Sequence, residues 1–247
     1  MGTGTDETTI VEAFTALAPN YETAMDRELQ VIWGIDYPRF ADRLVDIASV
    51  DERSSVLDIA TGTAVLPIRF AHQNPAPGRI VGLDITPAML AQGRQHLKSH
   101  PPPSEVELVC ASATDIPFAD ETFDTAICGL GMHHMPVPEV LSELERILKH
   151  NGRLFVACVG APPIWRTRVV DFVLRSIAAV FVWVFNGPRA RAEADAAFNI
   201  HTAEEWRGLL KQAGFTKFRI EVELRGQRFW YPDALMLKAT KGGRAIS

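Results

Sequence analysis

The chain has 247 residues, of which 47% are hydrophobic, so it is long enough to bury a substantial core as one α/β domain. Its net charge of −5 and scattered basic residues, apart from Arg189 and Arg191, argue against nucleic acid as a substrate. The cysteines, Cys110, Cys128 and Cys158, lie inside or at the ends of apolar strand-like runs. We therefore expect buried reduced thiols and no metal site.

The first residues of the chain, 1–9, are small and polar and do not resemble a signal peptide, which favours a cytoplasmic protein. Apolar residues then recur at three- and four-residue spacing, which predicts three helices before the first strand. These helices are Thr9–Leu17, Glu22–Trp33 and Pro38–Ala48.

Strand-like and helix-like segments alternate from residue 55 to residue 159, which predicts a parallel sheet covered by helices on both faces. The segments are Ser55–Ile59, Ala64–His72, Arg79–Asp84, Pro87–Leu97, Glu105–Cys110, Thr125–Cys128, Pro138–Leu148 and Arg153–Val159. The last part of the chain adds a helix ended by Gly214 and two strands. These segments are Thr202–Ala213, Phe218–Glu223 and Ala234–Ala239.

The stretch Val169–Phe185 is too apolar for an ordinary surface helix. Asp171 and Arg175 restrict its uninterrupted apolar run to about half of the ~18 residues that a membrane span needs. Three interpretations stay open: a helix that caps a hydrophobic substrate pocket, a packing or dimer helix, and an interfacial membrane contact.

A turn of small residues follows the first predicted strand, and an acid ends the second. The turn is Asp58-Ile59-Ala60-Thr61-Gly62-Thr63-Ala64, and Asp84 lies 84 − 62 = 22 residues beyond Gly62. This spacing places Asp84 to accept hydrogen bonds from two ribose hydroxyls. The turn lacks the G-x-G-x-x-G of a dinucleotide site, and an acid at the strand tip repels a pyrophosphate but suits an ammonium group. S-adenosylmethionine has that ammonium group, a ribose and no phosphate.

Further motifs follow in order along the chain. They are Ala111-Ser112-Ala113-Thr114-Asp115-Ile116-Pro117-Phe118, Phe123-Asp124, Met132-His133-His134-Met135 and Glu145-Arg146-Ile147-Leu148-Lys149-His150-Asn151-Gly152-Arg153-Leu154. With these motifs, the chain resembles the class I S-adenosylmethionine-dependent methyltransferases from about Ala13 to about Ala239. The resemblance implies a Rossmann-like, doubly wound α/β sheet, mostly parallel with one antiparallel strand. It also implies S-adenosyl-L-methionine as cofactor and S-adenosyl-L-homocysteine as product.

The resemblance implies a single methyltransferase domain over residues 1–247. Residues 1–50 would form a helical lid and residues 51–160 the cofactor-binding core. Residues 161–200 would form a helical substrate-pocket insertion after the fifth strand, and residues 201–247 a C-terminal helix and strands.

By position in these motifs, the cofactor-binding residues are implied to lie in turns and at strand ends. They are Tyr21, Asp58, Ala60, Thr61, Gly62, Thr63, Asp84, Ile85, Met89, Ser112, Ala113, Thr114 and Gly129. Ala60 and Ala64 replace two family glycines and crowd the turn by a methyl group each. Ser112 stands where many relatives carry an Asp that accepts a hydrogen bond from the adenine amino group, and a neutral hydroxyl makes a weaker bond there.

A sulfonium methyl group is already activated, so the protein mainly has to align the acceptor and exclude water. His133 and His134 are candidate bases for a protonated nucleophile, with a packing or capping role as the alternative. Aromatic residues outside the sheet predict an apolar acceptor pocket, although each also suits an ordinary core. They are Trp33, Trp165, Phe181, Trp183 and Trp230.

The pattern is similar to the ubiquinone/menaquinone C-methyltransferases and to natural-product methyltransferases. His133-His134 replaces the usual asparagine-containing turn of the quinone branch, which favours a secondary metabolite as acceptor. We expect O- or C-methylation of a hydrophobic small molecule, natural-product or quinone-like, by a monomer or homodimer without a transmembrane span. Two alternatives stay open: an S-adenosylmethionine-binding enzyme of cyclisation or rearrangement, and a degenerate, non-catalytic binding module.

Overall fold

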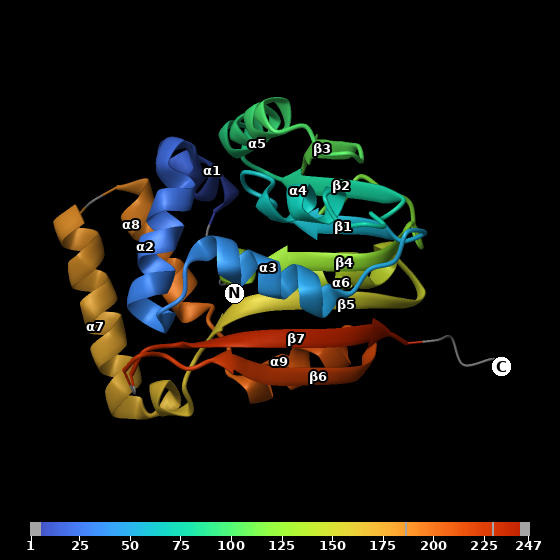
Figure 1. Cartoon of the computed structure of the whole chain (residues 1–247). Helices are drawn as coiled ribbons and strands as arrows, with labels where there is room; N and C mark the ends of the chain where they lie inside the picture. The colour runs from blue at the N-terminus through green and yellow to red at the C-terminus, as the bar shows by residue number, and fades with distance from the viewer. Residues whose placement is uncertain (1–5, 186, 229, 243–247) are drawn as a thin grey trace.

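The computed structural model describes residues 6–185, 187–228 and 230–242, except for the side chain of Phe181. Within these residues, seven strands form one sheet in the order β3-β2-β1-β4-β5-β7-β6 (Figure 1). Among the described strands, β7 alone runs in the direction opposite to the other six, which confirms the predicted mostly parallel sheet with one antiparallel strand. The strands are β1 (Ser55–Ile59), β2 (Arg79–Asp84), β3 (Val106–Cys110), β4 (Phe123–Gly129), β5 (Leu148–Gly160), β6 (Phe215–Leu224) and β7 (Asp233–Lys241).

Two hydrophobic cores lie on the two faces of the sheet, because successive side chains of a strand point to opposite faces. In β1, Val56 joins the core that α3 (Tyr37–Ala48) and α4 (Val65–Ala71) cover. Leu57 joins the core under α6 (Val137–Ile147) and α9 (Ala203–Gln212) on the other face. Helix α5 (Pro87–Ser99) packs beside β2 and β3.

Three helices stand beside the carboxyl ends of the parallel strands (Figure 1). They are α1 (Glu7–Leu17), α2 (Tyr21–Trp33) and α8 (Pro188–Phe198). Short 3-10 helices link the other elements: η1 (Ala18–Asn20), η2 (Met132–His134) and η3 (Pro163–Arg166). The expected N-terminal helices are therefore present, and α1 also contacts α8, which comes from the predicted insertion.

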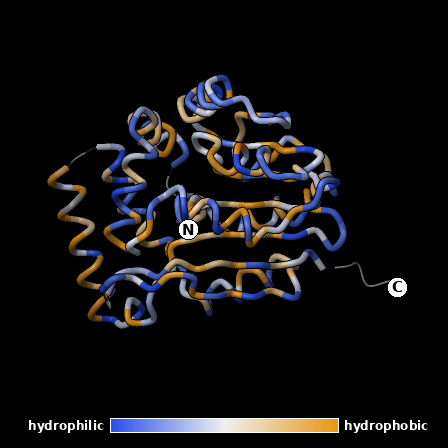
Figure 2. Tube along the Cα trace, viewed as in Figure 1, coloured by the Kyte–Doolittle hydropathy of each residue, from blue (hydrophilic) through white to orange (hydrophobic). Residues whose placement is uncertain are grey.

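The apolar stretch after β5 forms α7 (Arg168–Phe185), which lies outside α8 and the body of the protein (Figure 1). Figure 2 shows its hydrophobic character, and most of its apolar side chains are exposed, with Trp183 82% and Val169 74% accessible. It packs against α8 and η3. Among the described helices, none combines the length and hydropathy required to cross a bilayer.

The predicted boundaries of β1 and β2 are confirmed, whereas β5 begins earlier than expected, at Leu148. One prediction about the cysteines is wrong: Cys110 is exposed. It ends β3, which is an edge strand and is less covered than the central strands. Cys128 and Cys158 are buried free thiols, as expected.

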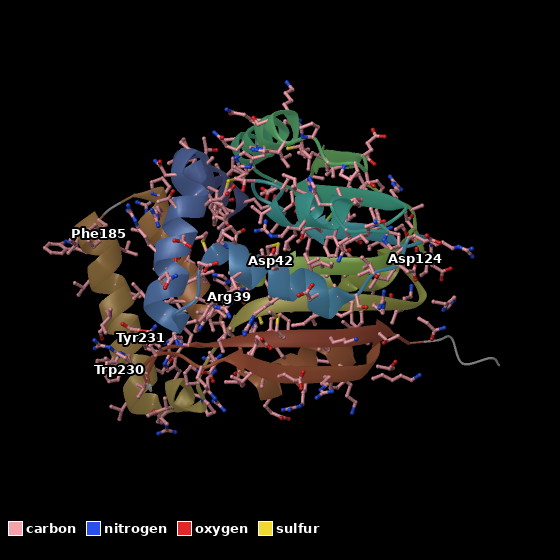
Figure 3. The ribbon with its side chains drawn as sticks, viewed as in Figure 1. Arg39, Asp42, Asp124, Phe185, Trp230 and Tyr231 are labelled. Atoms are coloured by element: carbon pink, nitrogen blue, oxygen red, sulfur yellow. The ribbon has the colours of Figure 1, made fainter. Side chains whose placement is uncertain are left out.

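Asp124 has a structural role at the end of the sheet opposite α7 (Figure 3). Its Oδ2 accepts hydrogen bonds from the Ser55 amide at 2.9 Å, the Ser55 hydroxyl at 2.6 Å and Lys149 Nζ at 2.8 Å. These bonds from Lys149 and Ser55 lower the pKa of Asp124 against the opposing effect of desolvation. The carboxylate joins β1, β4 and the start of β5.

Arg146, at the end of α6, anchors the loop that follows β3. Its guanidinium donates to the carbonyl oxygens of Ile116 and Phe118 at 2.9 and 2.8 Å. It also forms a two-pronged ion pair with Glu143, with distances of 2.9 and 2.8 Å. Glu143 in turn accepts from the Ile116 amide at 2.9 Å. The arginine thus fixes a loop whose first residues reach the candidate active site.

Replacing Arg146 by Ala should lower the free energy of unfolding by about 2 kcal/mol, because two carbonyl groups and two carboxylates, those of Glu143 and Asp120, lose a charged donor. Arg146→Lys should recover only part of this loss, since an ammonium cannot reproduce the planar fork. Urea denaturation with an unchanged m-value measures the effect. Arg207→Ala, which removes an exposed pair with Glu204 within α9, is the control and should change stability by less than about 0.5 kcal/mol. Equal effects of the two alanine variants would contradict this role.

Candidate active site

A pocket opens at the carboxyl ends of β1 to β4, where the strand order reverses between β1 and β4. Ligands of open α/β sheets bind at this type of position. Three groups of residues line it: strand ends, loops of the sheet, and α1, α2 and α8. The sequence-predicted residues among them are Tyr21, Trp33, Ala60, Gly62, Asp84, Ile85, Met89, Ser112, Ala113, Thr114, Gly129, His133 and His134.

Asp84, at the end of β2, is held by backbone amides. The Gly62 amide donates to its Oδ2 and the Thr86 amide donates to its Oδ1, each at 2.8 Å. Burial raises the pKa of Asp84, and these two bonds oppose that shift. Each carboxylate oxygen has a second lone pair, so both can also accept from hydroxyl groups of a ligand.

Asp58, at the tip of β1, is buried below the pocket and does not line it. Its Oδ2 accepts from the Thr61 hydroxyl at 2.6 Å, whereas its buried Oδ1 has no hydrogen-bond partner among the described residues. Burial, with a smaller contribution from the Asp84 charge, raises the pKa of Asp58 to about 8. Thr61 and Thr63 likewise lie outside the pocket lining, and the Thr63 hydroxyl donates to Glu22 at 2.8 Å.

The turn after β1 has a left-handed backbone at three positions. Gly62 has φ +56°, and Ala60 and Ala64 have φ 51° and 63°. From the sequence we expected the two alanines only to crowd the turn, but they also adopt a conformation that costs an L-residue roughly 1–2 kcal/mol. The Ala60 methyl group fits because its neighbour across the pocket is Gly131, where an added Cβ would lie 2.6 Å from it.

The loop after β3 closes one end of the pocket with small and polar groups. Ser112 lies at the centre of a hydrogen-bond cluster: its hydroxyl donates to Glu7 Oε1 at 2.6 Å and lies 2.7 Å from the Thr114 hydroxyl. The Thr114 amide donates to the same Ser112 oxygen at 3.1 Å. Ile85 and the buried Met89 add apolar surface beside this end.

Aromatic rings of α1 and α2 cover the pocket. The Tyr21 ring lies close to Gly62, where an added Cβ would be 3.6 Å from it. Phe14 contacts the edge of Tyr21 at 6.5 Å and of His134 at 5.0 Å between ring centroids. Phe14 was not identified from the sequence, since one aromatic residue on an amphipathic helix also suits an ordinary core.

His133 and His134 lie on η2, just after β4, and both line the pocket. Desolvation lowers the pKa of His134 to about 4 and that of His133 well below its ordinary value. Both rings are therefore neutral at neutral pH, and the buried Nδ1 atom of each has no partner among the described residues. Asn199 fixes this turn by donating to the carbonyl oxygens of His133 and Met135 at 3.1 and 2.6 Å.

The acceptor end differs from the sequence-based expectation. Of the four aromatic residues predicted for the acceptor end whose side chains the structure describes, Trp33, Trp165, Trp183 and Trp230, only Trp33 lines the pocket. Trp183 projects from the exposed α7, and the Trp165 indole donates to the Trp230 carbonyl at 3.2 Å outside the pocket. The Phe181 side chain lies outside the described part of the structure. Among the described residues, α8 therefore lines the pocket and α7 does not, because the apolar side chains of α7 point outward.

Other residues take the places that the aromatic residues were expected to occupy. Met25, Leu29 and Ile32 come from α2, and Arg189 and Glu193 come from α8. Burial, and then the charge of Glu28, raises the pKa of Glu193 to about 7. The sequence did not indicate that Arg189 and Glu193 line a pocket, because their position depends on how α8 packs against α1.

Comparisons with known proteins agree on the class of protein. A methyltransferase domain family model matches residues 56–152. The ubiquinone/menaquinone biosynthesis C-methyltransferase of Citrifermentans bemidjiense is 29% identical over 83% of this chain and 87% of its own length. The demethylmenaquinone methyltransferase of Listeria welshimeri is 29% identical over 85% of this chain and 86% of its own.

The fold is shared with solved structures of low identity. The geranyl diphosphate C-methyltransferase of Streptomyces coelicolor, in complex with S-adenosyl-L-homocysteine, matches with a TM-score of 0.60 and 14% identity, over 81% of this chain and 78% of that one. The sheet order, the pocket at the strand ends and the similarity to these relatives together support a class I S-adenosylmethionine-dependent methyltransferase.

Proposed function

We propose that this enzyme methylates a quinone-like ring, which lies between α2, α8 and η2 in the pocket. The main support for this proposal is that a single pocket contains both ends of the reaction. The Asp84 carboxylate, with its two amide donors, lines one end, and apolar residues and His133 line the other. A cofactor at one end and an acceptor at the other would then meet within the same water-poor space.

The residues present fit S-adenosylmethionine. Asp84 would accept from the two ribose hydroxyls, and Ile85 and Met89 would contact the adenine. The unpartnered Oδ1 of Asp58 fits the ammonium group of the methionine portion, directly or through water. The bound cofactor supplies a methyl group on a sulfonium, which a nucleophile attacks directly.

The acceptor chemistry rests on the lining and on the relatives. One of the relatives compared is named a ubiquinone/menaquinone biosynthesis C-methyltransferase, and another is named a demethylmenaquinone methyltransferase. An apolar wall of Met25, Leu29 and Trp33 suits a hydrophobic ring. Arg189 and Glu193 at the same end would bind the ring oxygens of a reduced quinone. These groups support a hydroxylated aromatic acceptor with a greasy substituent.

His133 is the better of the two candidate bases. Phe14 packs at about a right angle against the His134 ring, whereas among the rings of the described residues the His133 ring contacts only the His134 ring. A neutral imidazole can accept the hydroxyl proton of a phenol-like acceptor as the new bond to the methyl group forms. We further propose that the chain works as one catalytic unit, since α1, α2 and α8 complete a pocket whose floor is the sheet.

Calorimetric titration with S-adenosylhomocysteine tests the cofactor site. The wild-type protein should bind it saturably and should not bind NAD. Asp84→Ala should weaken binding by at least about tenfold, because charge-assisted bonds to the ribose are lost. Asp46→Asn, an exposed acid on α3 away from the pocket, should leave affinity unchanged. Absence of binding by the wild-type protein would refute the proposal.

Methyl transfer to reduced demethylmenaquinone analogues, followed as S-adenosylhomocysteine release, tests the acceptor and the base. His133→Ala should lower turnover by roughly 10²-fold or more with unchanged cofactor affinity, and His134→Ala should lower it less. The exposed His100→Ala is the control. Full turnover in both pocket variants would remove the histidines from the proton transfer.

Asp58 should make stability fall as pH rises. Its folded-state pKa of about 8 exceeds the ordinary value of 3.8, so the folded chain holds a proton that the unfolded chain releases between these values. Asp58→Asn, which cannot ionise, should therefore raise the melting temperature, and by more at pH 8 than at about pH 5. The same variant should bind S-adenosylhomocysteine more weakly. A melting-temperature difference that is independent of pH would contradict the shifted pKa.

A further inference from the structure

The end of the pocket beside β3 is where an adenine would lie. Cys110 pairs with Asp84 across the two strands, and the Ala111 amide donates to the Asp84 carbonyl at 3.2 Å. The loop after β3 therefore begins directly beside the acid that would hold the ribose. Met89, Ser112 and Thr114 line this end of the pocket, so a base attached to that ribose would lie beside them.

This loop offers the adenine amino group no carboxylate of its own. Its pocket-lining residues are Ala111, Ser112, Ala113 and Thr114. Ser112 is a poor acceptor here, because its oxygen already receives the Thr114 amide at 3.1 Å and lies 2.7 Å from the Thr114 hydroxyl. The serine hydroxyl hydrogen is also engaged, because it is donated to Glu7 Oε1 at 2.6 Å. Both lone pairs and the hydrogen of the serine are thus engaged or crowded.

Glu7 supplies the missing group from the other end of the chain. It lies in the first turn of α1, 105 residues from Ser112 in sequence, and it lines the same pocket. The Ser112 hydroxyl holds only Oε1, so the second carboxylate oxygen has no hydrogen-bond partner among the described residues. A carboxylate accepts from an amino group more strongly than a neutral hydroxyl does.

We propose that Glu7 accepts a hydrogen bond from the 6-amino group of the cofactor's adenine, and that Ser112 positions the Glu7 carboxylate for this contact. The inference rests on the proposed cofactor site. It makes α1 part of the recognition of the base, so that the lid helix closes over an adenosyl group through a contact that a purine without the amino group cannot form.

The test compares two ligands by calorimetry: S-adenosylhomocysteine and its analogue with hydrogen in place of the adenine 6-amino group. The wild-type protein should prefer the adenosyl ligand by roughly tenfold or more, as for a charge-assisted hydrogen bond. Glu7→Ala should remove most of this preference. Glu12→Ala, which removes an exposed acid from the same helix outside the pocket, should retain it.

A rescue variant separates recognition from folding of α1. Glu7→Ala combined with Ser112→Asp should restore the preference, because the carboxylate returns on the opposite side of the same contact. Ser112→Asp alone should not raise the preference above that of the wild-type protein, since two carboxylates would then face each other.

Two results would overturn the proposal. One is an unchanged preference in Glu7→Ala, and the other is an equal loss of affinity for both ligands, which would assign Glu7 only to the stability of the lid. No binding of S-adenosylhomocysteine by the wild-type protein would instead refute the cofactor site itself, so the two failures are distinguishable.

Discussion

The Asp84 carboxylate joins the turn after β1 to the end of β2, and the rest of the pocket depends on this connection. A buried carboxylate is costly unless donors surround it, and the amides of Gly62 and Thr86 are the donors here. The Gly62 amide reaches the carboxylate from a left-handed turn, and the Thr86 amide reaches it from the residues just after β2. The glycine adds no side chain to the space above the strand ends, which the Tyr21 ring covers.

Two acids, Asp84 and the buried Asp58, lie at and below the floor of the pocket. Burial, and to a smaller extent the Asp84 charge, raises the pKa of Asp58, and neither acid forms an ion pair with a lysine or arginine in the part of the chain that the structure describes. Two acids without a basic partner disfavour a phosphate at this site. The positive φ values of Ala60 and Ala64 add backbone strain at the same place. Stability is thus lower at the position where binding is required, as at many functional sites.

Much of the fold could be predicted from sequence because its signals are local. The alternation of apolar runs and small-residue turns located β1 and β2 to the residue, and the order of the motifs identified Asp84, Gly62 and Ser112 as neighbours. The acceptor end could not be predicted in this way. Trp183 and Trp165 are as apolar as Trp33, and only the tertiary packing of α7 and η3 places them outside the pocket. Glu7 gave no signal at all, since its contact with Ser112 joins residues that are 105 apart in sequence.

Phe14 has a further physical consequence. Its ring touches Tyr21, which lies over the turn after β1, and also His134, which lies after β4. A movement of α1 away from the strand ends would break both contacts. It would also expose the His134 imidazole to water, and the pKa of this ring would rise from about 4 toward the ordinary value near 6.5. Acid would therefore favour the open position of α1, because the open form would retain a proton that the closed form rejects.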